Sequence, residues 1–217
     1  MAEVKEIITD LHALNERSDE INVISENTLM REIVSNLKKT MKAKNIRALS
    51  APAIGYNKRI FCVDFEDNEI KTFINPIIAK AEGIALSREQ CTSIPGKTYI
   101  RPRNSKVTVI YQRPLGQTEN REFLGMAASV IQHEIDHLDG MILPIIGLEI
   151  DEDFDKASEE ERQEVIEMYM ESLDMRTNEI NKEIEEDPEL KQMTDAINFM
   201  TEVQTGKITL EKIEEKS

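Results

Sequence analysis

The stretch that decides the fold is Gln132-His133-Glu134-Ile135-Asp136-His137-Leu138-Asp139-Gly140. Residues four apart lie on one face of an α-helix, so His133 and His137 can present their imidazole rings to a single ion. Glu134 is placed to reach a water molecule on that ion rather than the ion itself. A divalent ion lowers the pKa of its water toward about 7, and a carboxylate can then take and return the proton. The pattern therefore predicts metal-dependent hydrolysis of a carbonyl compound.

Apolar residues in the same stretch indicate that this helix lies in the core. Ile131 and Ile135 are interleaved with the two histidines and the glutamate. Burying unpaired histidines and a carboxylate in an apolar core would be costly. A true metal site is therefore favoured over a chance match to the pattern.

A site of this kind needs a third protein ligand, and the residues alone leave its source open. The metzincin pattern requires a histidine six residues after His137, but that position is Leu143 and no histidine follows. A gluzincin would use a downstream glutamate, for which Glu149 is one candidate. The other candidate is upstream Cys91, in the segment Arg88-Glu89-Gln90-Cys91-Thr92-Ser93-Ile94-Pro95-Gly96.

The flanking sequence predicts an α+β body with mostly antiparallel strands and few helices. Runs rich in β-branched and aromatic residues indicate strands, and apolar residues spaced four apart indicate helices. The predicted strands are residues 59–65, 70–74, 106–111 and 121–124, and the predicted helices are residues 27–42 and about 125–138.

The charge is concentrated after residue 150, which predicts two parts. The chain has 217 residues and a net charge of −15, but Asp151–Ser217 alone holds 22 acidic and 8 basic residues. Ser158 and Glu161 fit a capping box at the start of a helix, and an apolar stripe at Leu190, Met193, Ile197, Met200 and Val203 indicates another. We expect a metal hydrolase domain at residues 1–150 and an acidic helical extension at residues 151–217.

The same charge distribution limits the partners. Clustered Lys and Arg are needed to bind phosphates, so direct nucleic-acid binding and binding to anionic membranes are not expected. No apolar stretch approaches the roughly 20 residues that span a bilayer, and no secretory signal is evident, so a cytoplasmic location is expected. The apolar stripe leaves open a protein partner or a homodimer formed through the acidic extension.

Three segments, taken in order, resemble the motifs of the peptide deformylase family. Gln132–Gly140 matches the family motif Gln-His-Glu-x-Asp-His-Leu-x-Gly completely. Glu89-Gln90-Cys91-Thr92-Ser93 is similar to Glu-Gly-Cys-Leu-Ser. Ala48-Leu49-Ser50-Ala51-Pro52-Ala53-Ile54-Gly55 is similar to Gly-φ-Ala-Ala-x-Gln-φ-Gly, where φ is apolar. The resemblance covers roughly residues 25–147 and leaves the acidic extension outside.

The resemblance implies antiparallel sheets packed around a central metal-binding helix. The implied activity is removal of the N-formyl group from the initiator methionine of new peptides, with release of formate. Cys91, His133 and His137 would hold the metal, and Glu134 would be the general acid/base. The backbone N–H of Thr92 would help to hold the oxyanion. Ferrous iron is the expected metal, with zinc or nickel as alternatives.

The resemblance also implies a methionine pocket and exposes two departures from the family. The pocket residues would be Ala48, Leu49, Gly55, Glu89 and Val130. The family glutamine that holds the oxyanion is Ala53 here, and the family glycine before the cysteine is Gln90.

Losing one oxyanion donor costs roughly 10²–10³ in rate, so we expect a slow deformylase or one with an altered substrate. As a hypothesis, Gln90, Ser50 or Thr92 supplies the missing donor. The first alternative is a catalytically impaired binding or regulatory protein on the same scaffold, and a further alternative is a gluzincin-like protease.

Overall fold

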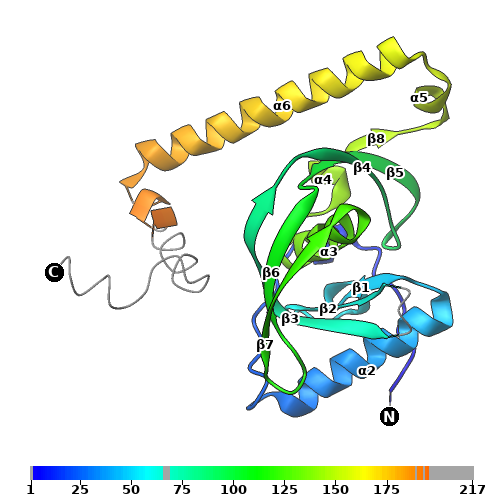
Figure 1. Ribbon diagram of the computed structural model, residues 1–217, viewed down its shortest axis with the longest axis vertical. Coiled ribbons are helices and arrows are strands. Elements are labelled where there is room, and N and C mark those ends of the chain that lie inside the picture. The colour runs from blue at the N-terminus through cyan, green and yellow to red at the C-terminus, as the bar shows by residue number, and fades with distance from the viewer. Residues whose placement is uncertain (1, 66–68, 189, 193, 196–217) are drawn as a thin grey trace. The chain divides into compact units, whose positions relative to one another are not determined.

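The computed structural model describes residues 2–65, 69–188, 190–192 and 194–195. The chain divides into two compact units, Met1–Asp151 and Glu152–Ser217. The first unit combines two antiparallel sheets with short and medium helices, which confirms the predicted α+β class (Figure 1). The second unit is helical in its described part.

The larger sheet has five strands in the order β1-β2-β3-β6-β7. Every neighbouring pair is antiparallel. Its strands are β1 (Ala48–Ser50), β2 (Ile60–Asp64), β3 (Ile70–Glu82), β6 (Lys106–Gln112) and β7 (Thr118–Leu124). The predicted strands at 59–65, 106–111 and 121–124 are confirmed, with β7 beginning earlier than expected.

Strand β3 is longer than predicted, because it continues through a proline. The sequence suggested an end at residue 74, before Asn75 and Pro76. The pairing of β3 with β6 shifts register between Ile74 and Ile77, and Asn75 adopts a left-handed φ of 48°. An irregularity of this kind accommodates a residue that cannot donate to the ladder, so the strand resumes beyond it.

The smaller sheet has the order β4-β5-β8 and is also antiparallel. Its strands are β4 (Ala85–Cys91), β5 (Ile94–Arg103) and β8 (Leu148–Ile150). Cys91 pairs with Ile94, so Thr92 and Ser93 alone form the turn between β4 and β5. This hairpin carries the cysteine motif at its tip.

Strand β2 of the larger sheet is buried on both faces, since alternate residues of one strand point to opposite sides. Ile60 and Cys62 belong to a core cluster shared with α2 (Asn27–Lys44). Phe61 and Val63 belong to a second cluster shared with α3 (Gly125–Leu138). The continuous apolar run of β2 is therefore explained by a helix on each side, and α3 lies enclosed by strands (Figure 1).

The C-terminal end of α3 is fixed by the N-terminal segment of the chain. The Ser18 backbone N–H donates to the Leu138 carbonyl at 2.8 Å. Gly140 has a φ of +73°, and a Cβ there would lie 2.8 Å from the Asn15 carbonyl oxygen. Both the backbone conformation and the contact therefore require glycine at this position.

The remaining helices of the first unit are short: α1 (Leu11–Leu14), the 3₁₀ helix η1 (Pro52–Ile54) and α4 (Leu143–Ile146). The second unit contains α5 (Glu152–Lys156) and α6 (Glu159–Glu186). The Ser158 side chain accepts from the Glu161 backbone N–H at 3.2 Å and the Glu161 carboxylate accepts from the Ser158 N–H, so the predicted capping box is present.

Of the predicted apolar stripe after residue 189, Met193, Ile197, Met200 and Val203 lie outside the described residues. Among the helices that are described, none combines the length and the apolar character needed to cross a membrane.

Candidate metal centre

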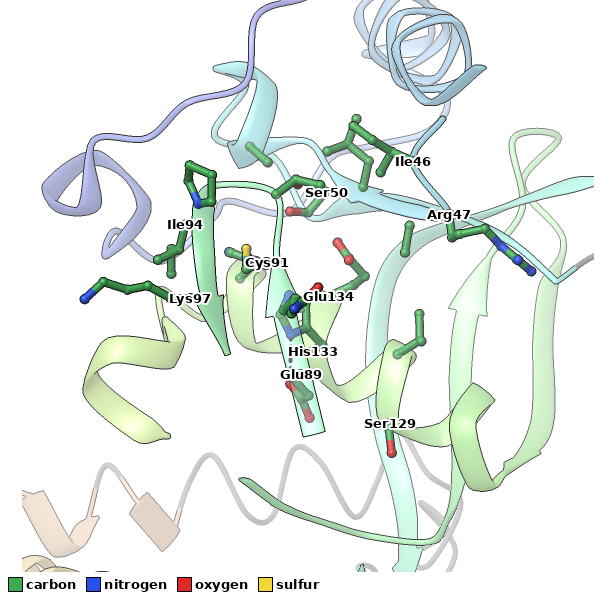
Figure 2. A pocket seen from close by; sticks show the side chains of 18 of the residues that line it. Ile46, Arg47, Ser50, Glu89, Cys91, Ile94, Lys97, Ser129, His133 and Glu134 are labelled. Atoms are coloured by element: carbon green, nitrogen blue, oxygen red, sulfur yellow. Dashed lines mark hydrogen bonds and ion pairs between the residues drawn. The ribbon is translucent and has the colours of Figure 1, made fainter. Parts of the chain in front are cut away.

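Three side chains from two elements converge on one point of the first unit. The ligand atoms of Cys91, His133 and His137 all lie within 4.8 Å of one another. The Cys91 Sγ is 3.2 Å from the His137 Nε2, and the two imidazole ring centroids are 5.0 Å apart. Cys91 comes from the tip of the β4–β5 hairpin and the histidines from adjacent turns of α3 (Figure 2).

This convergence favours Cys91 over Glu149 as the third ligand that the residues alone left open. Glu149 is exposed and binds the Lys97 Nζ at 2.9 Å and the Tyr99 hydroxyl at 3.2 Å. It therefore belongs to the β5–β8 pair and not to the cluster, whereas Cys91 lies directly beside His137.

The geometry fits a metal ion. Metal–sulfur distances near 2.3 Å and metal–nitrogen distances near 2.0–2.1 Å place tetrahedral ligand atoms roughly 3.3–3.6 Å apart. The separation between Cys91 and His137 is close to this range. A set of one thiolate and two imidazoles suits Fe²⁺, Zn²⁺ or Ni²⁺ on ligand softness.

A buried carboxylate orients the first histidine. The Glu89 Oε2 lies 2.9 Å from the His133 Nδ1, which leaves the His133 Nε2 to face the cluster. Arg103 donates two hydrogen bonds to the same carboxylate, at 2.7 Å from its Nε and at 2.9 Å from its Nη2. The Arg103 Nη1 donates to Asp136. Carboxylate–histidine–metal chains of this kind fix the ring and strengthen the ligand.

Electrostatics within this chain keep Glu89 ionised. Burial would raise its pKa, but the hydrogen bonds from Arg103 and His133 outweigh burial and lower the pKa to about 2. Burial would lower the pKa of His133, yet hydrogen bonds with Cys91 and Glu89 raise it to about 10. Burial, with the nearby His133, lowers the pKa of His137 to about 3.

Glu134 lies beside the cluster with properties suited to proton transfer. It is only 4% exposed, and burial raises its pKa to about 7, with His133 and Ser50 acting in the opposite direction. A carboxyl group with a pKa near neutrality can both take and return a proton. Its Oε2 has no hydrogen-bond partner among the described residues, so it is free to face a reacting molecule.

The cluster opens into a cavity of about 700 Å³, which is large enough for a few residues of peptide. Of the predicted pocket residues, Ala48, Leu49, Glu89 and Val130 line it, together with Met126 and other residues. Figure 2 shows the labelled side chains around this cavity.

Gly55 and Glu89 differ from the other predicted pocket residues. Gly55 is not among the lining residues; it has a φ of 86° and ends the η1 turn, a conformation that favours glycine. Glu89 does border the cavity, but both of its carboxylate oxygens are bound by Arg103 and His133. Its part is to hold His133, so it offers little to a methionine side chain.

The departures from the motifs and the candidate replacement donors lie on three elements: β1, η1 and the β4–β5 hairpin. Ala53 is 3% exposed, lines the cavity and offers no polar group. The Gln90 amide donates to the Thr98 hydroxyl at 3.1 Å, across the β4–β5 pair. Thr92 is exposed in the hairpin turn. Ser50 is fully buried, and its hydroxyl has no hydrogen-bond partner among the described residues.

Sequence reasoning missed Arg103 and Asp136 as parts of the site. Asp136 enters the sequence analysis only as part of the Gln132–Gly140 motif, and Arg103 receives no role there. The available signal was that both side chains border a predicted core, where a charge requires a partner.

Comparison with known proteins gives concordant matches. The sequence profile of the polypeptide deformylase family matches residues 4–144. The peptide deformylase of Dictyoglomus turgidum is 38% identical over 114 residues, covering 52% of this chain and 74% of that protein. The peptide deformylase of Pseudothermotoga lettingae is 35% identical over 130 residues, covering 59% of this chain and 74% of that protein.

Solved structures show the same fold. The peptide deformylase of Thermotoga maritima has a TM-score of 0.59 at 28% identity, covering 67% of this chain and 97% of that one. A class I type b peptide deformylase from Acinetobacter baumannii with bound Met-Ala-Ser has a TM-score of 0.62, at 22% identity, and covers 67% of this chain and 99% of that one. The second likeness concerns the fold alone.

Proposed function

This chain belongs to the polypeptide deformylase family of metal amidohydrolases, and from that premise we propose that it removes the N-formyl group from the initiator methionine of newly made peptides. The observation that carries this proposal is the convergence of Cys91, His133 and His137 beside Glu134 at the floor of a peptide-sized cavity. The family supports formylated peptides as the substrate class.

The metal would be held by Cys91, His133 and His137, and ferrous iron is the proposed ion, with zinc or nickel as substitutes. When bound, the ion would supply Lewis-acid activation at the reacting centre. Glu89 would keep His133 oriented toward the ion, since its carboxylate already binds the His133 Nδ1.

Glu134 would carry the proton through the reaction. Its carboxylate takes a proton from water as the water oxygen attacks the formyl carbon. The carbon–nitrogen bond then breaks, Glu134 gives the proton to the departing amine, and formate leaves. The Thr92 backbone N–H would stabilise the oxyanion, and Ala48, Leu49 and Val130 would enclose the methionine side chain.

Ala53 gives a reason to expect a slow reaction or an altered substrate. It provides no side-chain donor where one would face the oxyanion, and the Gln90 amide is engaged elsewhere. Loss of one oxyanion donor typically costs roughly 10²–10³ in rate. We therefore expect turnover below that of an enzyme with both donors.

Formate release from a formyl-methionyl peptide tests the proposal. The protein would be loaded with ferrous iron under anaerobic conditions, with Glu134→Gln as the blank, because this variant keeps the shape of the side chain and removes the base. Release well above the blank supports a deformylase. Release equal to the blank, from folded and metal-loaded protein, would sink the proposal and favour the binding or regulatory alternative.

A further inference from the structure

Two buried polar atoms face the same cavity without partners. The Ser50 hydroxyl is in a residue with 0% exposure, and the Glu134 Oε2 is in one with 4% exposure. Neither atom has a hydrogen-bond partner among the described residues. Ser50 ends β1, Glu134 lies on α3, and both line the cavity next to Cys91 (Figure 2).

An unpaired buried hydroxyl has a cost, so its position calls for a physical reason. Burying a polar group without a partner costs about 1–3 kcal/mol, and most buried polar side chains in proteins have partners. Alanine at this position would fill nearly the same space without that cost. Burial raises the pKa of Glu134, and Ser50 is one of the side chains that act in the opposite direction.

The other donors considered from the sequence are not available for this part. The Gln90 amide is bound to Thr98, Thr92 is exposed in the turn, and Ala53 has no donor. The two histidines face the ligand cluster. Of the side chains that line the cavity on the β1–η1 side, Ser50 is the buried one with a hydroxyl to donate.

We propose that Ser50 is a positioning residue: its hydroxyl donates a hydrogen bond to the Glu134 carboxylate and holds that carboxylate toward the reacting water. A hydroxyl donor to a carboxylate is a charge-assisted hydrogen bond, stronger than a neutral one. It would fix the side-chain rotamer of Glu134. The consequence for turnover rests on the proposed deformylase function, whereas the hydrogen bond itself does not.

Carbon-13 NMR of the glutamate carboxyl groups tests the hydrogen bond without any need for activity. In metal-free protein at pH 9, the Glu134 resonance is identified as the one that disappears in Glu134→Gln. Ser50→Ala should shift it. Ser18→Ala is the matched control, since Ser18 is also buried with an unpartnered hydroxyl but does not line the cavity. An unshifted resonance in Ser50→Ala would overturn the proposal.

Kinetics then test the role. Ser50→Ala should lower kcat roughly 10-fold to 100-fold, the range for one hydrogen bond to a charged group, with KM and metal content unchanged. In a Glu134→Asp background the shorter side chain places the carboxylate farther from Ser50. There Ser50→Ala should lower kcat less than about threefold. Equal losses in both backgrounds would mean that Ser50 acts independently of Glu134, and would overturn the positioning role.

Two further outcomes are covered by this design. If Ser50→Ala fails to fold, Ser50→Cys replaces it, because a thiol is a weaker donor of similar size and should give an intermediate loss in kcat. An unreduced kcat would overturn the proposal. If the wild-type protein releases no formate, the proposed function fails, and the NMR comparison decides the hydrogen bond on its own.

Discussion

The α3 side and the β1–η1 side of the cavity differ in how their polar groups are supported. On the α3 side, His133 is held by Glu89, which is held in turn by Arg103, and Arg103 also binds Asp136. On the β1–η1 side, Ala53 offers no polar group and the Ser50 hydroxyl has no partner among the described residues.

The difference shows where this fold tolerates change. A buried charge without its partner is costly, so each member of the α3-side network depends on the next. Alanine and serine on the other side carry no charge and can vary without loss of the fold. We therefore expect substitutions on the α3 side to affect metal binding and stability, and substitutions on the β1–η1 side to affect turnover alone.

The largest effect is expected for Cys91→Ala. Structural zinc sites bind with about 10–16 kcal/mol over four ligands, so loss of one ligand should weaken metal binding roughly 100-fold to 1000-fold. Metal content after dialysis against a graded chelator measures this. Cys62→Ala is the matched control, because Cys62 is a buried cysteine outside the cluster that bonds only weakly to Thr72, at 3.6 Å. Equal retention by both variants would remove Cys91 from the ligand set.

Glu89→Gln should have the next largest effect. It removes the charge between Arg103 and His133, so metal affinity should fall roughly 10-fold to 100-fold. Stability should fall by about 3 kcal/mol, since the buried Arg103 loses the more buried of its two carboxylate partners. Chemical unfolding and metal titration measure the two losses. Glu82→Gln provides the control at an exposed ion pair, with Lys80 at 2.7 Å. A variant as stable as the control would contradict the proposed support of His133.

Ala53→Gln should raise kcat about 10-fold, because it places an amide donor on the wall that lacks one. We expect a smaller rise in kcat than a full oxyanion donor would give, because the larger glutamine side chain must fit at a position that is only 3% exposed. Ala53→Met fills a similar volume without a donor and should not raise kcat. Steady-state formate release measures both, and an equal response of the two variants would assign the change to volume alone.

The smallest effect is expected for Gln90→Ala. The Gln90 amide is exposed and engaged with Thr98, so the loss should change kcat less than about twofold and stability by no more than about 0.5 kcal/mol. The same formate assay and unfolding curve apply. A large loss of kcat would show that Gln90 turns into the cavity during the reaction and that the two sides are less distinct than they appear in the resting structure.

Sequence periodicity was sufficient for the central helix and for most of the larger sheet. The apolar residues Ile131 and Ile135 placed α3 in the core, and the structure begins and ends this helix at the predicted residues Gly125 and Leu138. The β2 run was equally clear, because a strand buried on both faces is apolar throughout.

The β4–β5 hairpin was not predicted as strands. The segment Ser87-Arg88-Glu89-Gln90 is polar in sequence and shows no strand pattern. Glu89 is nevertheless buried, because it pairs with Arg103 across the hairpin and with His133 on α3, and no local sequence pattern shows these pairings. The metal ligands could be predicted from motifs. The contacts of Arg103 could not, because Arg103 pairs with residues that are 14 and 33 positions away in the sequence.

The contact between Gly140 and the Asn15 carbonyl has a consequence for the order of events during synthesis. The chain is made from the N-terminus at about 5–20 residues per second, so roughly 6–25 seconds separate the synthesis of these two residues. Until Gly140 is made, the segment around Asn15 and Ser18 lacks its acceptor at Leu138. Assembly of the metal centre is therefore a late step in the life of the nascent chain.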